Sequence, residues 1–314
     1  MESATHQPRH EATNANFPRD GEGRVHHVGV KKGEGGPKFS YVQSFLMTTV
    51  ANRILSVGDH RRASVIASLF DNPSSNLVTT SSRGFTVHTG TFNKVPVTVI
   101  ATGMGFPMMD FLVRECRAVV EGPMVIMRFG TCGTPQTHIP IGSVVVASEG
   151  SIFIRRNPDA WEQDGSWDEK ESKYIFSKVV RSDPEISKRL AENMKKMVAD
   201  CQVYEGLGAT ADSFYASQGR TDDSFDDDNA NLIDQMLEKY SSISALEMET
   251  FHLFDLARCS KGTIRSSAAA IVLAQRRSNA FLDKATTERI EKEGGRAVLL
   301  TLSETDLTAP SNGN

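Results

Sequence analysis

The fold is easiest to understand from Met127-Arg128-Phe129-Gly130-Thr131-Cys132-Gly133, which follows the apolar run Pro123-Met124-Val125-Ile126. A short apolar run that ends in glycines is typical of a buried parallel strand. Ligands bind at the carboxyl ends of such strands in open α/β sheets. Here that end carries a guanidinium, a threonine hydroxyl and backbone N–H groups left uncovered by two glycines, all groups that bind an oxyanion such as phosphate. The alternative is a strand end at which Arg128 pairs with a surface carboxylate.

The composition is that of an ordinary globular protein, and it narrows the choice of partners. The chain has 314 residues, of which 24% are charged, and its net charge is −4. This mild acidity gives no electrostatic reason to expect nucleic acid or a membrane as a partner. The four cysteines are scattered without paired spacing, so they predict neither a zinc site nor a disulfide framework. They fit a reducing compartment, and we expect the cytosol.

Strands alternate with helices along the chain. The patterns predict strands at 53–57, 85–91, 97–101, 123–129, 141–147, 204–210, 243–246 and 267–273. They predict helices at 61–70, 108–121, 184–199, 231–240, 251–257 and 286–302. The natural architecture is therefore one α/β domain with a mixed central sheet flanked by helices. We place this domain at 23–308, between a flexible tail over 1–22 and a flexible end over 309–314.

Three further segments do not follow the alternation of strands and helices. The apolar face of 41–52 fits a short helix or an arm packed on the domain. Residues 150–175 are polar and contain both tryptophans, which indicates a long excursion from the sheet. The acidic run 221–228 is most simply a solvated loop.

Two more stretches carry groups suited to a site. Gly58 and Arg62 stand where the first predicted strand turns into a helix, and a helix N-terminus favours a bound anion. Glu247 and Glu249 stand on another strand-to-helix turn. These two acids either act in a site or are helix-start carboxylates favoured by the helix dipole.

Five motifs between about residue 27 and residue 302 resemble those of nucleoside phosphorylases, in the hexameric/dimeric family that includes uridine phosphorylase. In chain order they are His27-Val28-Gly29, Gly58-Asp59-His60-Arg61-Arg62, Arg128-Phe129-Gly130-Thr131-Cys132-Gly133, Phe214-Tyr215-Ala216-Ser217-Gln218-Gly219-Arg220 and Glu247-Met248-Glu249. Each motif alone is weak evidence, but five in the family's order are strong. The resemblance implies a single domain whose mixed sheet is a partly closed barrel.

The resemblance also implies an activity, the reversible phosphorolysis of uridine to uracil and ribose 1-phosphate in pyrimidine salvage. Phosphate attacks the anomeric carbon through a transition state with oxocarbenium character, and the base leaves as an anion. The enzyme must therefore hold a phosphate dianion, orient a ribose and stabilise negative charge on the leaving uracil. Inorganic phosphate would be a co-substrate, and neither a cofactor nor a metal is implied.

Individual residues receive roles from the resemblance. Phosphate would be bound by Gly58, Arg62, Arg83, Arg128 and Thr131. Ribose would be bound by His27, Met248, Glu249 and Thr131, and uracil by Phe214, Gln218, Arg220, Cys132 and Gly133. Arg220, Arg128 and Glu249 are the predicted catalytic residues, with Arg220 donating to uracil O4, where charge accumulates. His27 and Arg83 would reach the site from a neighbouring subunit, which implies a homodimer with shared active sites, a hexamer being the alternative.

Some assignments stay open. Glu247 either supports the site or is structural, and Gln275 and Arg276 stand where relatives carry Asn-Arg beside the base pocket. Cys132 is expected to line the pocket as a small side chain, because nothing nearby activates its thiol. A histidine pair such as that of His27 is otherwise an ordinary surface feature.

Departures from the family's pattern bear on specificity. Purine-specific relatives place an aspartate after the strand that matches 267–273, whereas this chain has no carboxylate over 273–276, which favours a pyrimidine. The pair of residues that binds a monovalent cation in bacterial uridine phosphorylases has no convincing match, so we predict no such site.

The insertion at 155–173 and the long N-terminal segment resemble those of eukaryotic members of the family. The alternatives are a purine nucleoside phosphorylase or nucleosidase of the same fold, or a non-catalytic nucleoside-binding protein.

Overall fold

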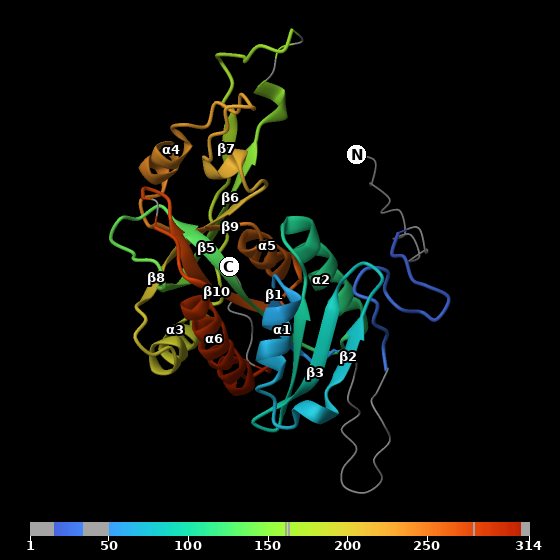
Figure 1. Cartoon of the computed structure of the whole chain (residues 1–314). Helices are drawn as coiled ribbons and strands as arrows, with labels where there is room; N and C mark the ends of the chain where they lie inside the picture. The colour runs from blue at the N-terminus through green and yellow to red at the C-terminus, as the bar shows by residue number, and fades with distance from the viewer. Residues whose placement is uncertain (1–15, 34–49, 161, 163, 279, 309–314) are drawn as a thin grey trace, which may run out of the picture.

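The structure is a computed structural model that describes residues 16–33, 50–160, 162, 164–278 and 280–308 (Figure 1). Most of the tail predicted over 1–22, and the end predicted over 309–314, lie outside the described residues. Residues 16–22 are described, and within them Arg19 forms a β-bridge with Val25 of the predicted domain. The predicted helix or arm over 41–52 also lies outside the described residues, except for 50–52.

A ten-stranded mixed sheet forms the centre of the molecule. Four parallel strands, β4, β1, β5 and β10, carry the site; their bounds are Val95–Ala101, Arg53–Val57, Met124–Thr134 and Ile264–Gln275. β3 (Thr86–Phe92) and β2 (Leu77–Thr80) extend one edge as antiparallel strands. The other strands are β6 (Val144–Arg156), β7 (Tyr174–Phe176), β8 (Val203–Ala211) and β9 (Ile243–Glu247). Because β5 pairs with both β9 and β10, the ring β10-β6-β8-β9-β5 closes into a barrel, as predicted.

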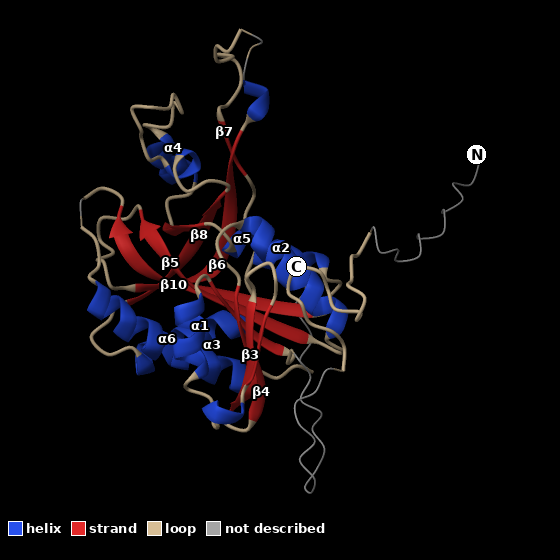
Figure 2. Ribbon diagram, turned by 45° about the vertical axis from the view of Figure 1, so that its right-hand side comes forward, coloured by secondary structure: helices blue, strands red, loops and turns tan. Residues whose placement is uncertain are grey.

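Helices cover both faces of the sheet (Figure 2). On one face lie α1 (His60–Ala67), α3 (Pro184–Met197) and α6 (Lys284–Glu304), which bury Ile66, Leu190 and Val298 against the strands. On the other face lie α2 (Phe106–Val119) and α5 (Thr250–Cys259), which bury Leu112 and Leu253. The remaining α-helix of the described chain, α4 (Leu232–Lys239), packs beside β6 and β8. Burial on both faces explains why the parallel strands are continuous apolar runs.

Local residues set the backbone at two element boundaries. Asp183 caps α3 by accepting a hydrogen bond from the backbone N–H of Ile186 at 3.0 Å. Asn93 and Lys94 join β3 to β4 with positive φ angles of 51° and 65°, the backbone shape of a tight hairpin turn.

The excursion predicted over 150–175 was wrong in its first part. β6 continues to Arg156, because β8 pairs with it as far as the partners Ile154 and Ala211. The register shifts between Val146 and Gly150, where the glycine has a φ of 106°. The chain then leaves the sheet and returns as β7, which pairs with the end of β6. Nowhere in the described chain is there a helix long and apolar enough to cross a membrane.

Candidate active site

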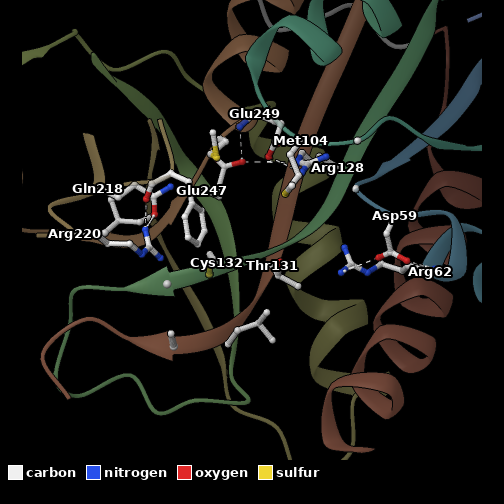
Figure 3. Close-up of a pocket in the computed structure, with 18 of the residues that line it drawn as sticks. Asp59, Arg62, Met104, Arg128, Thr131, Cys132, Gln218, Arg220, Glu247 and Glu249 are labelled. Carbon is white, nitrogen blue, oxygen red and sulfur yellow. Dashed lines mark hydrogen bonds and ion pairs between the residues drawn. The ribbon is translucent and has the colours of Figure 1, made fainter. Parts of the chain in front are cut away.

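A pocket with a volume of about 350 Å³ lies at the carboxyl ends of β1, β5, β9 and β10 (Figure 3). Parallel strands bring their ends to one edge of the sheet, which is why residues far apart in the sequence meet there. The predicted residues that line the pocket are Gly58, Arg62, Arg128, Thr131, Cys132, Gly133, Phe214, Gln218, Arg220, Met248 and Glu249. No group of three His, Cys, Asp or Glu side chains in the described ranges has the arrangement of a metal site.

Arg128 lies on β5 between two carboxylates. Its Nη2 donates to Glu249 Oε2 at 2.5 Å, and its Nε is 3.7 Å from Glu247 Oε2. The side chain of Arg128 and both carboxylates are buried. The alternative in which Arg128 pairs with a surface carboxylate is therefore wrong, because its partners belong to the pocket.

Arg62 lies in the first turn of α1 and is held by two short hydrogen bonds and two longer contacts. Its backbone N–H donates to Asp59 Oδ1 at 2.8 Å, which caps the helix. Its Nε donates to Glu291 Oε1 at 2.8 Å, a buried carboxylate on α6. The two Nη atoms make longer contacts, 3.4 Å to Asp59 Oδ2 and 3.5 Å to the carbonyl of Phe129. The guanidinium is thus anchored through Nε, while Nη1 and Nη2 keep donors for an anion.

The turn between β9 and α5 is built around Glu247. One carboxylate oxygen accepts the backbone N–H groups of Glu249 and Thr250, each at 2.9 Å, and the other accepts the hydroxyl of Thr210. Burial, together with the nearby charge of Glu249, raises the pKa of Glu247. Glu249 in turn accepts the backbone N–H of Gly105. Glu247 therefore supports the position of Glu249 as well as lining the pocket.

The far end of the pocket holds an aromatic ring, an amide and a guanidinium. Arg220 lies over the Phe214 ring at 3.8 Å, and its Nη1 donates to Gln218 Oε1 at 2.7 Å. Partial burial, helped by the positive charge of Arg276, lowers the pKa of Arg220 to about 10, which leaves the group protonated at neutral pH. These side chains offer hydrogen-bond donors and an aromatic face to a planar polar ring.

Two small residues of β5 complete this end. Burial raises the pKa of the Cys132 thiol, so the group stays protonated and presents a small neutral side chain. A Cβ added to Gly133 would stand 3.0 Å from Cδ of Arg276, so a larger residue would displace that arginine. Arg276 donates to the carbonyl of Gly219 at 3.3 Å and so lies next to the base end.

His27 and Arg83 lie outside the pocket of their own chain. His27 Nδ1 is 2.7 Å from Glu115 Oε1, and its ring stacks on Phe111 with centroids 3.7 Å apart. Arg83 Nη2 is 3.2 Å from His26 Nε2. The two predicted residues therefore share one surface, formed by the N-terminal segment, the β2–β3 turn and α2.

The site includes residues that the sequence patterns did not indicate. Asp59 and Glu247, which stand in two of the motifs, also line the pocket. So do six residues that no motif indicated, namely Gly103, Met104, Leu246, Leu273, Ala274 and Phe281. Phe281 is 70% exposed, and the backbone pairing of its segment with the end of β10, including the bridge between Ala274 and Phe281, brings it to the pocket. Glu291 was missed as well, because 229 positions separate it from Arg62 and no local pattern joins them.

The mixed sheet closes into a barrel, and the pocket joins anion-binding arginines to buried carboxylates and to an end that can bind a planar ring. Together these features define an enzyme of the phosphorylase type. The chain belongs to the Phosphorylase superfamily, which matches residues 52–302. This membership confirms the resemblance and the fold predicted from the motifs.

Individual relatives differ in the base they are named for. A solved structure from a study of two uridine phosphorylases of the oomycete Phytophthora capsici is 41% identical, with a TM-score of 0.85 over 94% of this chain and 99% of that one. A uridine phosphorylase of Thermococcus kodakarensis is 27% identical over 85% of this chain and 83% of its own length. A DeoD-type purine nucleoside phosphorylase of Oceanobacillus iheyensis is 28% identical over 74% and 80%.

Proposed function

We propose that this protein is a uridine phosphorylase, a pentosyltransferase that cleaves uridine with inorganic phosphate to uracil and ribose 1-phosphate. The observation that carries the proposal is the order of groups across one cavity of about 350 Å³. Arginines of α1 and β5 stand at one end, Glu249 lies in the middle, and Phe214, Gln218 and Arg220 stand at the other end. The 41% identical relative from a study of uridine phosphorylases supports the same substrate.

At the phosphate end, Arg62 and Arg128 bind the oxyanion, and Thr131 and the backbone of Gly58 complete the cradle. The Nη atoms of Arg62 are free of short contacts, so they donate without first breaking a strong bond. Arg128 exchanges part of its pairing with Glu249 for phosphate. Glu249 then accepts ribose hydroxyls, so phosphate and nucleoside are held side by side, as an in-line attack requires.

At the base end, the pocket stabilises the leaving group. Gln218 Oε1 is fixed by Arg220, so the amide presents its Nε2 donor to a uracil carbonyl and its second lone pair to N3–H. Arg220 donates to O4, and its charge gains most when the C–N bond breaks and the uracil becomes anionic. That differential interaction accelerates the reaction, because it is stronger in the transition state than in the bound nucleoside.

The base end also favours a pyrimidine over a purine. The residues that line it are Phe214, Gln218, Arg220, Leu273, Ala274 and Phe281. None of these six carries a carboxyl group that could protonate a purine N7. β10 ends at Gln275, whose Nε2 donates to the carbonyl of Thr137 at 3.0 Å and is therefore engaged elsewhere.

We further infer a cytosolic homodimer in which each subunit lends His27 and Arg83 to its partner's pocket. The support is that both residues lie on one surface away from their own pocket. On that same surface α2 presents the half-buried ring of Phe111, which stacks on His27 and which a second subunit would cover. A shared site would add a third arginine to the phosphate cradle.

A substrate panel tests the base assignment. Purified protein is incubated with saturating phosphate and either uridine, deoxyuridine, thymidine or inosine, and the released base is quantified. We expect uracil from uridine and no hypoxanthine from inosine. Cleavage of inosine at a comparable rate would contradict the assignment and place the protein with the purine enzymes.

A further inference from the structure

The segment Phe214–Arg220, here called the base loop, is held by its own backbone hydrogen bonds and by side chains outside it. Within the loop, the backbone N–H groups of Gly219 and Arg220 donate to the carbonyls of Ala216 and Tyr215. Its only regular element is the single 3-10 turn η3 (Ala216–Gln218). Asn229 Nδ2 donates to the carbonyl of Ala216 at 2.9 Å and to the carbonyl of Arg220 at 2.8 Å. One buried amide, 3% exposed, therefore ties the start of the turn to Arg220, two residues beyond its end.

Asn229 is itself positioned by the end of β6 and by β7, the two strand segments that flank the excursion from the sheet. We call the described residues of 155–176 the arm; Figure 1 shows the arm running beside α4. Tyr174 of the arm donates its hydroxyl to the carbonyl of Asp227 at 2.7 Å, and Arg156 Nη1 pairs with Asp227 Oδ1 at 2.7 Å. Tyr174 also packs against Ala216 in one small apolar cluster with Leu232.

The acidic run 221–228 is therefore more than the solvated loop predicted from its composition. Most of its residues are exposed, but the side chain of Asp227 is only 12% exposed and is paired with Arg156. Lys173 pairs with the next residue, Asp228. The arm thus fixes the end of the run that leads directly into Asn229.

The base loop depends on the hydrogen bonds of Asn229 to hold Gln218 and Arg220 in the positions that bind a ring. Gln218 and Arg220 recognise a ring through hydrogen bonds, whose strength falls steeply when donor and acceptor shift or tilt. Without the amide of Asn229 the two carbonyls would lose their shared donor, and the turn would sample other shapes. The phosphate arginines lie on α1 and β5, which make their own contacts, so their geometry would not change.

We propose that Asn229, held in place by the arm, is a positioning residue for base recognition in the reaction proposed above. It touches neither substrate, and it acts by fixing the loop that carries Gln218 and Arg220. The inference rests on the proposed function, and it gives the arm a role in substrate binding.

The test compares Michaelis constants for the two substrates in the full-length protein. Asn229→Ala raises the KM for uridine about tenfold, because two buried hydrogen bonds that shape the loop are lost. The KM for phosphate stays within about twofold, since the arginines at that end are untouched. A purely structural role would lower the active fraction and change neither KM.

Asn193→Ala is the matched control. Asn193 is also 3% exposed and bridges α3 to Thr301 and Glu304 of α6, away from the pocket. The Asn193→Ala variant loses a buried amide of the same kind. We therefore expect it to have a lower thermal stability and unchanged Michaelis constants for both substrates. An equal rise in the KM for uridine in both variants would overturn the inference.

Tyr174→Phe keeps the test decisive if Asn229→Ala does not fold. It removes only the hydroxyl bonded to Asp227 and keeps the ring packed on Ala216. The KM for uridine then rises about threefold at constant KM for phosphate, as expected for one lost hydrogen bond. If the wild type is active and the folded variants keep the wild-type KM for uridine, this inference alone is overturned. Wild type without phosphate-dependent uridine cleavage would overturn the proposed function and this inference with it.

Discussion

Arg220→Ala is the substitution that most directly probes how the leaving base is stabilised. The guanidinium is partly buried, lies 3.8 Å over the Phe214 ring and bonds Gln218 Oε1 at 2.7 Å. Removal of one donor that faces developing charge typically costs about 10²–10³ in kcat, or about 2.7–4 kcal/mol. We therefore expect kcat for uridine to fall by about 10² or more, with a smaller rise in KM because Gln218 loses the group that orients it.

The assay is the initial rate of uracil release at saturating phosphate. A second nucleoside with a more stable leaving anion, 5-fluorouridine, should show a smaller defect, because its base needs less stabilisation when it departs. Arg277→Ala is the matched control, since Arg277 is an exposed arginine that pairs with Asp234. A kcat within about threefold of wild type, or equal defects with both nucleosides, would refute the reasoning, because a lost charge stabiliser costs far more.

Three further outcomes follow from the geometry of the site and its support. Glu291→Ala removes the carboxylate that holds Arg62, so the KM for phosphate rises about tenfold in initial-rate measurements while the KM for uridine stays constant. An unchanged KM for phosphate would show that Glu291 does not position Arg62 for phosphate binding. Inactive Arg83→Ala and inactive Arg128→Ala proteins regain activity when mixed, if sites are shared; verified subunit exchange without recovery argues against sharing. Gly294→Ala places a Cβ against the Phe129 ring. The overlap, about 1–3 kcal/mol, outweighs the gain in helix propensity, about 1 kcal/mol, so urea denaturation should show a less stable protein.

The pocket could be predicted from the sequence because its residues stand at strand ends. The motifs at Gly58, Arg128 and Glu249 each end a buried strand or begin a helix, and the carboxyl ends of parallel strands meet at one edge. Gly58, Arg128 and Glu249 were therefore predictable as neighbours, although they lie far apart in the chain. Their pairing was not predictable. The sequence left open whether Arg128 binds an oxyanion or pairs with a surface carboxylate, and only the structure identifies the buried Glu249 as its partner.

The supports of the site were beyond reach of the sequence. Glu291 meets Arg62 only because α6 packs on α1, and Asn229 meets Ala216 only because the arm places it there. Both are single residues in helical or polar segments, where such side chains are ordinary. The length of β6 was also misjudged, because a register shift near Gly150 interrupts the apolar pattern before the strand ends.

The central claim is that phosphate and a pyrimidine nucleoside occupy this pocket together. The most direct measurement is uracil release from uridine with and without inorganic phosphate, with ribose 1-phosphate quantified in parallel. We expect a rate of uracil release that saturates with phosphate and falls to background without it, with one ribose 1-phosphate formed per uracil. Uracil release at the same rate without phosphate, with free ribose as the product, would contradict it and identify a hydrolase.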